Sequence, residues 1–412
     1  MRSRTGSGSA KKPEQGYANG LVAGMKSLVF ANGRIVTPGG IVERGSVEVR
    51  EGRIAAVAKS IAADRANGGL IDLGGDYLLP GFVDVQVNGG GGVLFNDDPS
   101  TATAARIAEA HRAFGTTSLL PTLISDDLGK VEQAIRAIDE AVASKTPGIA
   151  GLHLEGPFRN VEKRGIHDER KLRPLSDEAL EMLTSARHAQ VVVTLAPERA
   201  RLDQIAHLAE SGIKVCMGHT NAGYDHTRRA LAAGVTGFTH LFNAMPAMQS
   251  RNPGVIAAAL ESNAWCGVIV DGKHVHPAML RLALRAKADR RLMLVTDAMP
   301  SVGADIDHFH LNGQRINVAD GVCLSDDGTL AGAALSMIDA VRNAAAMLDV
   351  GIEEASGMAS LVPCSFLGIA DRVGAIAPGQ RADLLRVSPA LAIRQVWIGG
   401  IEQADCHQLP AA

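Results

Sequence analysis

The alternation of two kinds of segment from Pro80 onward constrains the fold more than any other feature of this sequence. Short apolar runs alternate there with alanine-rich amphipathic segments. The expected strands are residues 82–88, 117–124, 149–155, 191–198, 214–220, 237–245, 266–272 and 291–299, and the expected helices include 101–114, 127–144, 176–188, 202–212, 225–234 and 277–287. Apolar strands that alternate with helices form a parallel sheet. Close to eight such units predict a (β/α)8 TIM-type barrel, which takes about 250 residues, and residues 80–367 supply that length.

The two ends of the chain have similar sequence patterns. Short β-like runs separated by NG, PGG and EG turns precede the barrel region, and similar runs return after it. A small β-sandwich-like domain built from both ends is the economical interpretation. The expected divisions are a flexible leader or tag (1–24), the first part of the β domain (25–78), the barrel (79–372), the second part of the β domain (373–403) and a tail (404–412).

Composition places the chain among soluble globular proteins, because 46% of the 412 residues are hydrophobic and 21% are charged. The net charge of −3 excludes a general affinity for nucleic acid or for an anionic membrane. An acidic substrate must therefore be held by local positive groups. No apolar run approaches the roughly 18–20 residues that span a bilayer.

The cysteines and the N-terminal residues predict a cytoplasmic location. The first twenty residues lack the apolar core of a secretory signal. Five scattered cysteines form no CxxC pair, which fits a reducing compartment where thiols are usually buried apolar groups. They are Cys216, Cys266, Cys323, Cys364 and Cys406.

Polar residues end several of the expected strands, and the carboxyl ends of barrel strands carry the active site. In chain order they are Gln86, Asn88, Glu155, His219, His240 and Asp297. One carboxylate and two imidazoles at one rim predict a divalent metal site with three protein ligands and an open position for water. A lone histidine at a strand end is usually structural, and a lone glutamate before glycine is usually a neighbour of a helix N-cap. Their shared placement at strand ends favours the metal site.

Asp297 follows the apolar run of the last expected strand. A carboxylate beside an activated water can take its proton and later deliver it to a leaving amine. The alternative is that Asp297 caps the next turn.

Taken together, these segments resemble the amidohydrolase superfamily, and most closely its N-acetylglucosamine-6-phosphate deacetylases. The resemblance runs from about residue 25 to residue 400. It is carried by LLPGFVDVQVNGGGGVLFND, HLEGPF with the later GIHD, GHTNA, THLFNAM, SRNPG, DGKHVHP, VTDAM and LAGAALSM. HLEGPF, GHTNA and THLFNAM in this order are the most specific of these motifs.

The resemblance implies a metal centre and its catalytic partners. Glu155, His219 and His240 match the metal ligands of the family. Asp297 matches the aspartate that acts as base toward water and then as acid toward the sugar amine. His167, in GIHD, matches the histidine that polarises the acetyl carbonyl together with the metal.

The resemblance also implies the substrate contacts. Asn243 and Ala244 match positions that contact the sugar, while Arg251 and His274 match the groups that hold the 6-phosphate. In this family the arginine comes from the neighbouring subunit, which implies a homodimer with shared active sites. Arginine also suits phosphate through its planar fork of donors. Taken alone, Arg251 could be an ordinary surface arginine, and His276 competes with His274. Further expected contacts are Ile166, Leu330, Ala331, Gly332 and Ala333.

Two departures from the pattern refine this expectation. Many amidohydrolases carry HxH at the end of the first barrel strand, where this chain has Gln86 and Asn88. An amide is a poor zinc ligand, so one divalent ion per subunit, most simply zinc, is expected. Ala333 stands where a serine is found in many relatives, which removes a hydroxyl contact to substrate.

The resulting hypothesis is metal-dependent deacetylation of N-acetyl-D-glucosamine 6-phosphate to D-glucosamine 6-phosphate and acetate, by water that the metal activates. The alternative within the superfamily is another amide hydrolase or a deaminase, because fold alone cannot separate these. A non-catalytic scaffold with the same shell is a second class, and the presence of all three expected ligands and Asp297 argues against it.

Overall fold

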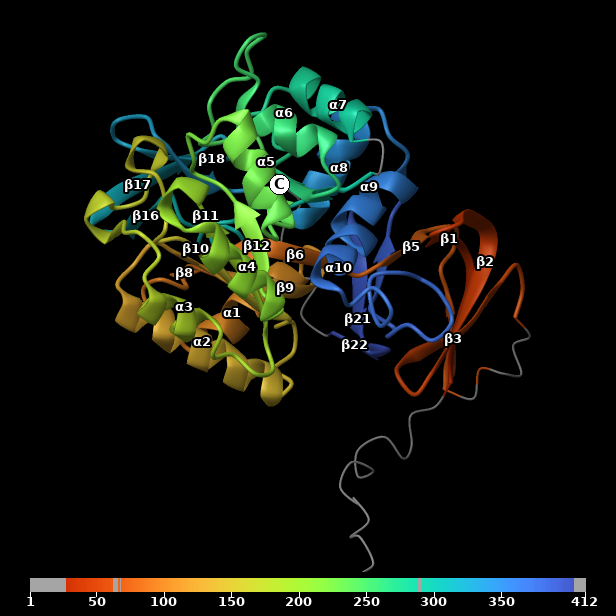
Figure 1. The fold of residues 1–412 in the computed structure, drawn as a ribbon. Coiled ribbons are helices and arrows are strands. Elements are labelled where there is room, and N and C mark those ends of the chain that lie inside the picture. The colour runs from red at the N-terminus through yellow and green to blue at the C-terminus, as the bar shows by residue number, and fades with distance from the viewer. Residues whose placement is uncertain (1–26, 62–65, 67, 288–289, 404–412) are drawn as a thin grey trace, which may run out of the picture.

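The computed structural model describes residues 27–61, 66, 68–287 and 290–403 (Figure 1). The expected leader and tail, residues 1–24 and 404–412, lie outside the described residues, as does Cys406. Among the described helices, none combines the length and apolar character needed to cross a bilayer.

Eight parallel strands form the barrel, and this confirms the expected fold class. Their order is β15-β14-β13-β12-β11-β10-β9-β6. The strands are β6 (Phe82–Val87), β9 (Thr116–Ile124), β10 (Gly151–Glu155), β11 (Gln190–Leu195), β12 (Lys214–Met217), β13 (Gly237–Phe238), β14 (Trp265–Val268) and β15 (Leu292–Leu294). A parallel bridge between Val87 and Ala298 closes the ring between the first and last strands.

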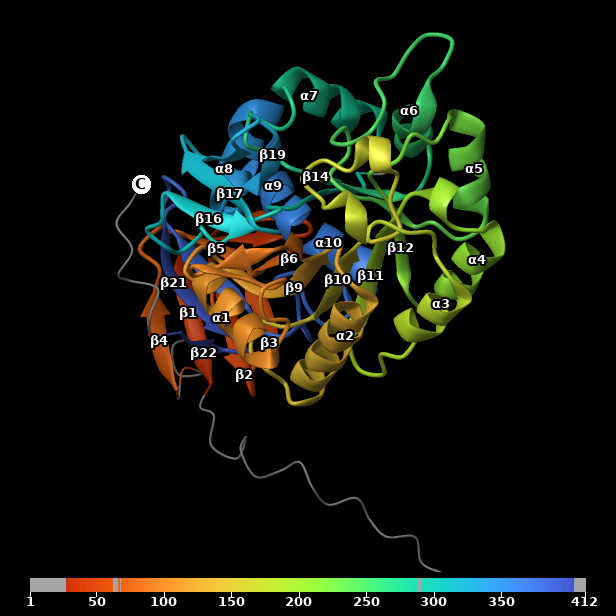
Figure 2. The same ribbon diagram turned by 90° about the vertical axis from the view of Figure 1, so that its left-hand side faces the viewer.

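Helices surround the barrel on the outside (Figure 2). They are α1 (Thr101–Arg112), α2 (Leu128–Ala143), α3 (Asp177–Leu183), α4 (Leu202–Glu210), α5 (Tyr224–Ala232), α6 (Gly254–Glu261), α7 (Pro277–Ala286), α8 (Met337–Leu348), α9 (Ile352–Ala359) and α10 (Leu361–Leu367). In α2 the buried residues Val131, Ile135 and Ile138 recur at helical spacing and join the main core. This periodicity explains why the amphipathic segments of the sequence were recognisable as helices.

The two ends of the chain meet in one mixed sheet beside the barrel (Figure 1). Its strands are β1 (Leu28–Thr37), β2 (Gly40–Arg50), β3 (Arg53–Ala58), β4 (Gly69–Asp72), β5 (Tyr77–Pro80), β20 (Leu384–Val387), β21 (Ile393–Ile398) and β22 (Ile401–Glu402). Strand β20 pairs antiparallel with β5, which joins the C-terminal strands to the N-terminal ones. The expected domain division after residue 78 falls inside β5.

A third sheet was not foreseen from the sequence. It is an antiparallel meander of β16 (His308–Leu311), β17 (Gln314–Ala319), β18 (Val322–Ser325) and β19 (Leu330–Ala333). Its buried side chains, among them Phe309 and Ile316, pack on Ile124 and Met299 from the barrel region. The NG, DG and DDG turns of this segment, spaced by short β-like runs, are the sequence pattern that could have indicated it. A small β7–β8 pair (Gly89–Gly90 and Val93–Leu94) follows β6.

Several element boundaries differ from expectation. The expected strand 237–245 contains only the two-residue strand β13, because the chain turns at His240 and Phe242, whose φ angles are positive. The expected helix 176–188 ends at Leu183. The four described cysteines are buried, as the composition suggested.

Trp397 packs in the hydrophobic core of the mixed sheet that the two chain ends form. It is 1% exposed, and its ring meets that of Phe30 edge-on with centroids 4.9 Å apart. We expect Trp397→Ala to lower the free energy of unfolding by about 3–5 kcal/mol, because it removes a large buried side chain. Chemical denaturation would measure the loss, with the 57%-exposed Ile401→Ala as control. Equal effects of the two substitutions would contradict this account.

Candidate active site

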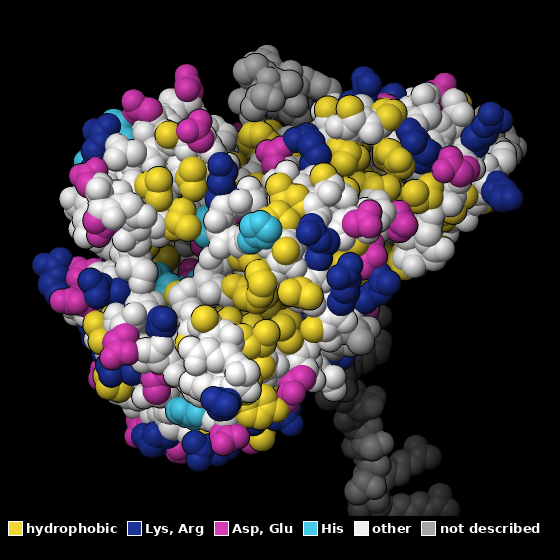
Figure 3. All heavy atoms as spheres, turned by 90° about the horizontal axis from the view of Figure 1, so that it is seen from above, with side chains coloured by type: hydrophobic (Ala, Val, Ile, Leu, Met, Phe, Trp, Pro, Cys, Tyr) yellow, Lys and Arg dark blue, Asp and Glu magenta, His cyan; other side chains and the backbone are white. Residues whose placement is uncertain are grey.

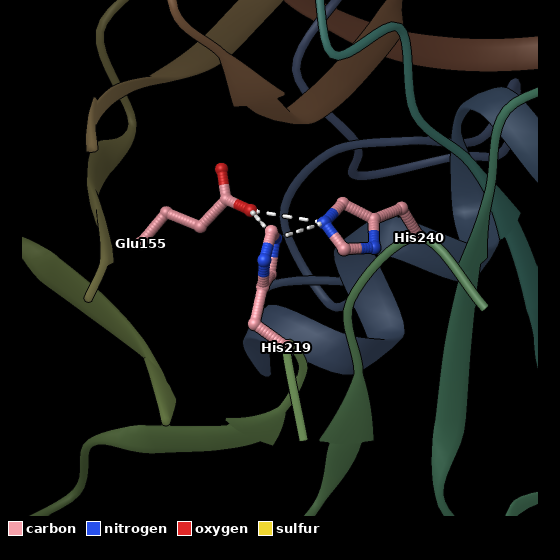
Figure 4. Close-up of side chains that lie close together, drawn as sticks. All are labelled: Glu155, His219 and His240. Carbon is pink, nitrogen blue, oxygen red and sulfur yellow. Dashed lines mark hydrogen bonds and ion pairs between the residues drawn. The ribbon is translucent and has the colours of Figure 1, made fainter. Parts of the chain in front are cut away.

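Glu155, His219 and His240 converge at the carboxyl rim of the barrel (Figure 4). Glu155 ends β10. His219 follows the end of β12 by two residues, and His240 follows the end of the adjacent strand β13 by two residues. Glu155 Oε1 lies 3.0 Å from His240 Nε2 and 3.3 Å from His219 Nε2, and the two Nε2 atoms are 2.9 Å apart. Three residues far apart in sequence therefore direct one oxygen and two nitrogens to a single point.

The histidine geometry fits a divalent cation. Nδ1 of His219 donates to the backbone carbonyl of Lys163 at 2.7 Å, which leaves the Nε2 lone pair directed at the cluster. Burial lowers the pKa of His219 to about 3, so its imidazole is neutral near pH 7, the state that binds metal. Both histidines have positive φ angles, 50° for His219 and 31° for His240. Such backbone conformations cluster at functional sites, and here they occur at both candidate ligands.

Glu155 is an ionised carboxylate that is almost fully buried. Burial by itself would raise its pKa, but Arg159 and the two histidines lower the pKa of Glu155 well below the usual value. Arg159 Nη2 lies 2.9 Å from Glu155 Oε1. Gln86 Nε2 donates to the other oxygen, Oε2, at 3.2 Å. The carboxylate is thus held from two sides.

Asp297 stands beside this cluster. Its Oδ1 accepts hydrogen bonds from Asn88 Nδ2 at 2.6 Å and from Gln86 Nε2 at 3.0 Å. Burial, followed by the nearby charge of Glu155, raises the pKa of Asp297. A carboxylate whose proton affinity is raised in this way suits proton transfer to and from a reacting group.

A buried carboxylate supports the turn that carries Asp297. Asp84 Oδ2 accepts from Thr296 Oγ1 at 2.5 Å, and Asp84 Oδ1 accepts from the backbone N–H of Gln86 at 3.2 Å. Thr296 directly precedes Asp297, whose φ is 51°. Asp84 therefore connects the first and last strands of the barrel under the site.

His167 lies on the next part of the rim with its ring close to His219 (centroids 4.9 Å apart). Its Nε2 is 2.5 Å from Arg159 Nη1, and its Nδ1 is 3.0 Å from Ser125 Oγ. Burial and the neighbouring Arg159 hold the pKa of His167 well below the usual range. The imidazole is therefore neutral.

A cavity of about 320 Å³ opens above these groups. This volume lies at the small end of the range for ligand pockets, about 300–1,000 Å³. The residues singled out from the sequence that line it are Asn88, Glu155, Ile166, His167, His219, His240, Asn243, Ala244, His274, Asp297, Leu330, Ala331 and Gly332. The cavity thus brings together most of the expected site.

Three of the expected site residues do not line the cavity. Gln86 lies beneath it and acts through its bonds to Glu155 and Asp297. Ala333 is buried behind the wall, where its backbone N–H donates to the carbonyl of Asp297 at 2.9 Å. Arg251 is exposed on the loop before α6.

The sequence reasoning missed several contributors. Arg159 and Ser125 contact His167, Thr296 and Asp84 support Asp297, and Glu162 and Lys163 line the cavity. Arg159 follows HLEGPF directly, so its place four residues after Glu155 could have drawn attention to it. No local pattern indicated the partners of Asp84.

The comparisons with known proteins agree with this geometry. The family model for the amidohydrolase family matches residues 77–401. An N-acetylgalactosamine-6-phosphate deacetylase from Shewanella sp. (strain ANA-3) is 39% identical over 376 residues, covering 90% of this chain and 95% of the relative. An N-acetylglucosamine-6-phosphate deacetylase from Haemophilus influenzae is 34% identical, covering 77% and 84%.

The solved structures give the same result. N-acetylglucosamine-6-phosphate deacetylase from Pasteurella multocida superposes with a TM-score of 0.88 at 34% identity, covering 92% of this chain and all of that one. The Mycobacterium smegmatis enzyme, solved in complex with N-acetyl-D-glucosamine-6-phosphate, gives 0.83 at 31% identity, covering 92% and 98%. Given the extent of the family match and of these identities, the chain belongs to the amidohydrolase family, whose members are metal-dependent hydrolases.

Proposed function

We propose that this protein hydrolyses the acetamide of N-acetyl-D-glucosamine 6-phosphate, giving D-glucosamine 6-phosphate and acetate. The observation that carries the proposal is the convergence of Glu155, His219 and His240 on one point, beside Asp297, in a cavity of ligand size. Relatives at 34% and 35% identity, from Haemophilus influenzae and Homo sapiens, bear this enzyme name, which supports the same substrate here.

The three convergent residues would hold one divalent metal ion, with zinc as the simplest occupant of a carboxylate and two imidazoles. When bound, such an ion supplies Lewis acidity that polarises the acetyl carbonyl and lowers the pKa of water. Gln86 and Asn88 occupy the positions that would serve a second ion, and both amides are already engaged with Asp297. This arrangement supports one ion per subunit.

Asp297 is the proposed proton carrier. Water loses a proton to the carboxylate as its oxygen attacks the acetyl carbon, and the same proton then passes to the sugar nitrogen as the C–N bond breaks. The raised pKa of Asp297 supports both steps, because the group must accept the proton and release it. Water supplies the oxygen of the released acetate, and no further reactant is needed.

The phosphate of the sugar is negatively charged, so positive side chains have to hold it. The rim of the cavity carries no surplus of such side chains. His274 lines the cavity with its Nδ1 bound to Asp271 Oδ2 at 2.6 Å, so Nε2 is the nitrogen left to contact phosphate. We assign Asn243, Ala244, Ile166 and the segment 330–332 to contacts with the rest of the sugar.

Arg251 is proposed to complete the phosphate site of a second subunit. It is exposed and stands apart from the cavity of its own chain. Met248, which is close to Arg251 in the sequence, is 49% exposed. Leu282, on α7, is 54% exposed. Figure 3 shows hydrophobic side chains gathered on the face seen from above, the side on which Figure 1 places α6 and α7. An apolar face of this kind supports a homodimer.

A cytoplasmic location, and the division into a barrel and an end domain, remain predictions from the sequence.

N-Acetylgalactosamine 6-phosphate is the second candidate substrate. Relatives at 39% and 32% identity, from Shewanella and Escherichia coli, carry the corresponding name. The two sugars differ only in the configuration at C4. The metal cluster and Asp297 act on the acetamide and serve either sugar, so the choice depends on the wall of the cavity.

An acetate-release assay on both phosphorylated sugars and on unphosphorylated N-acetylglucosamine tests the substrate. We expect the glucosamine derivative to give the highest kcat/KM and the unphosphorylated sugar the lowest. Arg251→Ala should lower kcat/KM for the phosphorylated sugar at least about tenfold, since it removes a charge-assisted phosphate contact. Arg136→Ala, on the solvent-exposed face of α2, is the matched control. A preference for the galactosamine derivative would support the second candidate, and no turnover of any of them would overturn both.

Replacing either histidine of the cluster should remove the metal. We expect His219→Gln and His240→Gln to lose zinc as well as activity, because two remaining ligands hold a divalent ion weakly. Metal content after dialysis against a low zinc concentration measures this, with the surface variant His308→Gln as control. Full zinc occupancy in both cluster variants would refute ligation.

Asp297→Asn should separate proton transfer from metal binding. The amide keeps the size of the side chain but cannot accept a proton, so kcat should fall by about 10²–10⁴-fold while zinc content stays near that of the unmodified enzyme. Asp307→Asn, at an exposed carboxylate, controls for loss of charge. Turnover near the original rate would rule out this role for Asp297.

A further inference from the structure

One side of the cavity is apolar, and the residues that form it have no role in the chemistry described so far. Ile124, Met299 and Leu311 line this side, and we call these three residues the apolar wall. Their exposed fractions are 6%, 2% and 2%. All three belong to one hydrophobic cluster, which also contains the buried side chains of the β16–β19 meander. The apolar wall is therefore the cavity-facing surface of a packed core.

Met299 is the member of the apolar wall that is nearest in the chain to the proposed proton carrier, two positions after Asp297. Its backbone N–H donates to the carbonyl of Ala333 at 3.0 Å, which connects it to β19. Its side chain packs against Gly332, where a Cβ atom would lie only 2.7 Å from Met299 Cγ. The φ angle of Gly332 is 66°, a conformation that also favours glycine. The close approach of β19 thus holds the Met299 side chain at the edge of the cavity.

The apolar wall faces the residues assigned to the sugar and its phosphate across the mouth of the barrel. Ile124 ends β9, whereas Asn243 follows β13 and His274 follows β14. In the strand order β13 and β9 are four places apart, which is half of a closed ring of eight strands. The candidate metal ligands come from β10, β12 and β13, within the same arc. A substrate bound over these ligands can therefore reach both sides.

The bonding of an N-acyl sugar predicts which part of the substrate meets the apolar wall. The carbonyl carbon carries the oxygen that the site polarises, the nitrogen that bears the sugar, and the alkyl part of the acyl group. A secondary amide is planar, and its two carbon substituents lie trans across the C–N bond. When the sugar extends toward Asn243 and His274, the alkyl group therefore points to the opposite side. An alkyl group is stabilised there, because its transfer from water to apolar surroundings is favourable.

We propose that the apolar wall binds the alkyl part of the acyl group, and that Met299 sets the longest acyl chain that the enzyme accepts. This inference rests on the proposed deacetylation and deepens it by naming the residues that select the acyl group. The apolar wall is buried and continuous with the cluster behind it, so a chain longer than acetyl has to displace packed side chains. Shortening Met299 makes room for such a chain and leaves the polar groups of the site unchanged.

The acyl preference is measured with N-acetyl-, N-propionyl- and N-butyryl-D-glucosamine 6-phosphate as substrates of the full-length, zinc-loaded protein. In each case water cleaves the C–N bond and releases a carboxylate and the same amino sugar phosphate, so one assay for the primary amine serves all three. We expect kcat/KM of the unmodified protein to fall at least about tenfold from the acetyl to the butyryl substrate, since one methylene in a tight pocket changes it by about 10–200-fold. Equal kcat/KM for the three substrates would overturn the proposal.

Variants of the apolar wall test which residues set this preference. Met299→Ala should raise the ratio of kcat/KM for the butyryl substrate to that for the acetyl substrate at least about tenfold, because it enlarges the cavity on this side. Leu311→Ala should raise the same ratio and keeps the test open if Met299→Ala does not fold.

Met358→Ala is the matched control. Met358 is 3% exposed on α9 and does not line the cavity, so its loss removes the same atoms from a core elsewhere. The ratio should stay unchanged in this variant. An unchanged ratio in both wall variants, with activity lowered equally for all three substrates, would mean that the apolar wall supports the fold or the sugar and does not select the acyl group.

These outcomes are distinguishable from failure of the proposed function. A protein that releases no amine from any of the N-acyl sugar phosphates would refute the deacetylase assignment itself. A protein that is fully active on the acetyl substrate, but whose acyl preference does not respond to Met299 or Leu311, would keep the assignment and refute only the role of the apolar wall. If the galactosamine derivatives are the better substrates, the same three acyl groups on that sugar give the same test.

Discussion

Closure of the barrel between its first and last strands is the constraint on which the site depends. The Val87–Ala298 bridge, together with the bond from the backbone N–H of Asp297 to the carbonyl of Gln86 at 3.0 Å, brings residues 211 positions apart into contact. The side chain of Gln86 can then touch both Glu155 and Asp297. Without this closure the candidate ligands on the middle strands would be separated from Asp297, the proposed proton carrier.

The charged groups of the site are buried and lie close to one another. Glu155 remains ionised because Arg159 and the two histidines surround it, while Asp297 has a raised pKa because burial and the charge of Glu155 act on it in the same direction. Two carboxylates on one rim thus acquire different properties from their surroundings. One is suited to hold a cation and the other to exchange protons.

Side chains beneath the rim hold the groups that line the cavity in place. Asp84, Thr296 and Gln86 hold Asp297 from below, and Arg159 holds Glu155 and His167. Such supporting contacts restrict the conformational freedom of the site residues and so fix their orientation.

The sequence by itself determined the barrel, the meeting of both chain ends in a β-rich unit, and the strand-end residues, because periodicity and position along a strand are local properties. Glu155, His219, His240 and Asp297 were all identifiable in this way. The β16–β19 sheet, the exclusion of Ala333 from the cavity wall and the contacts of Arg159 were decided only by the tertiary structure. Whether a buried cation at position 159 meets a carboxylate, an imidazole or nothing depends on packing between segments that no sequence pattern relates.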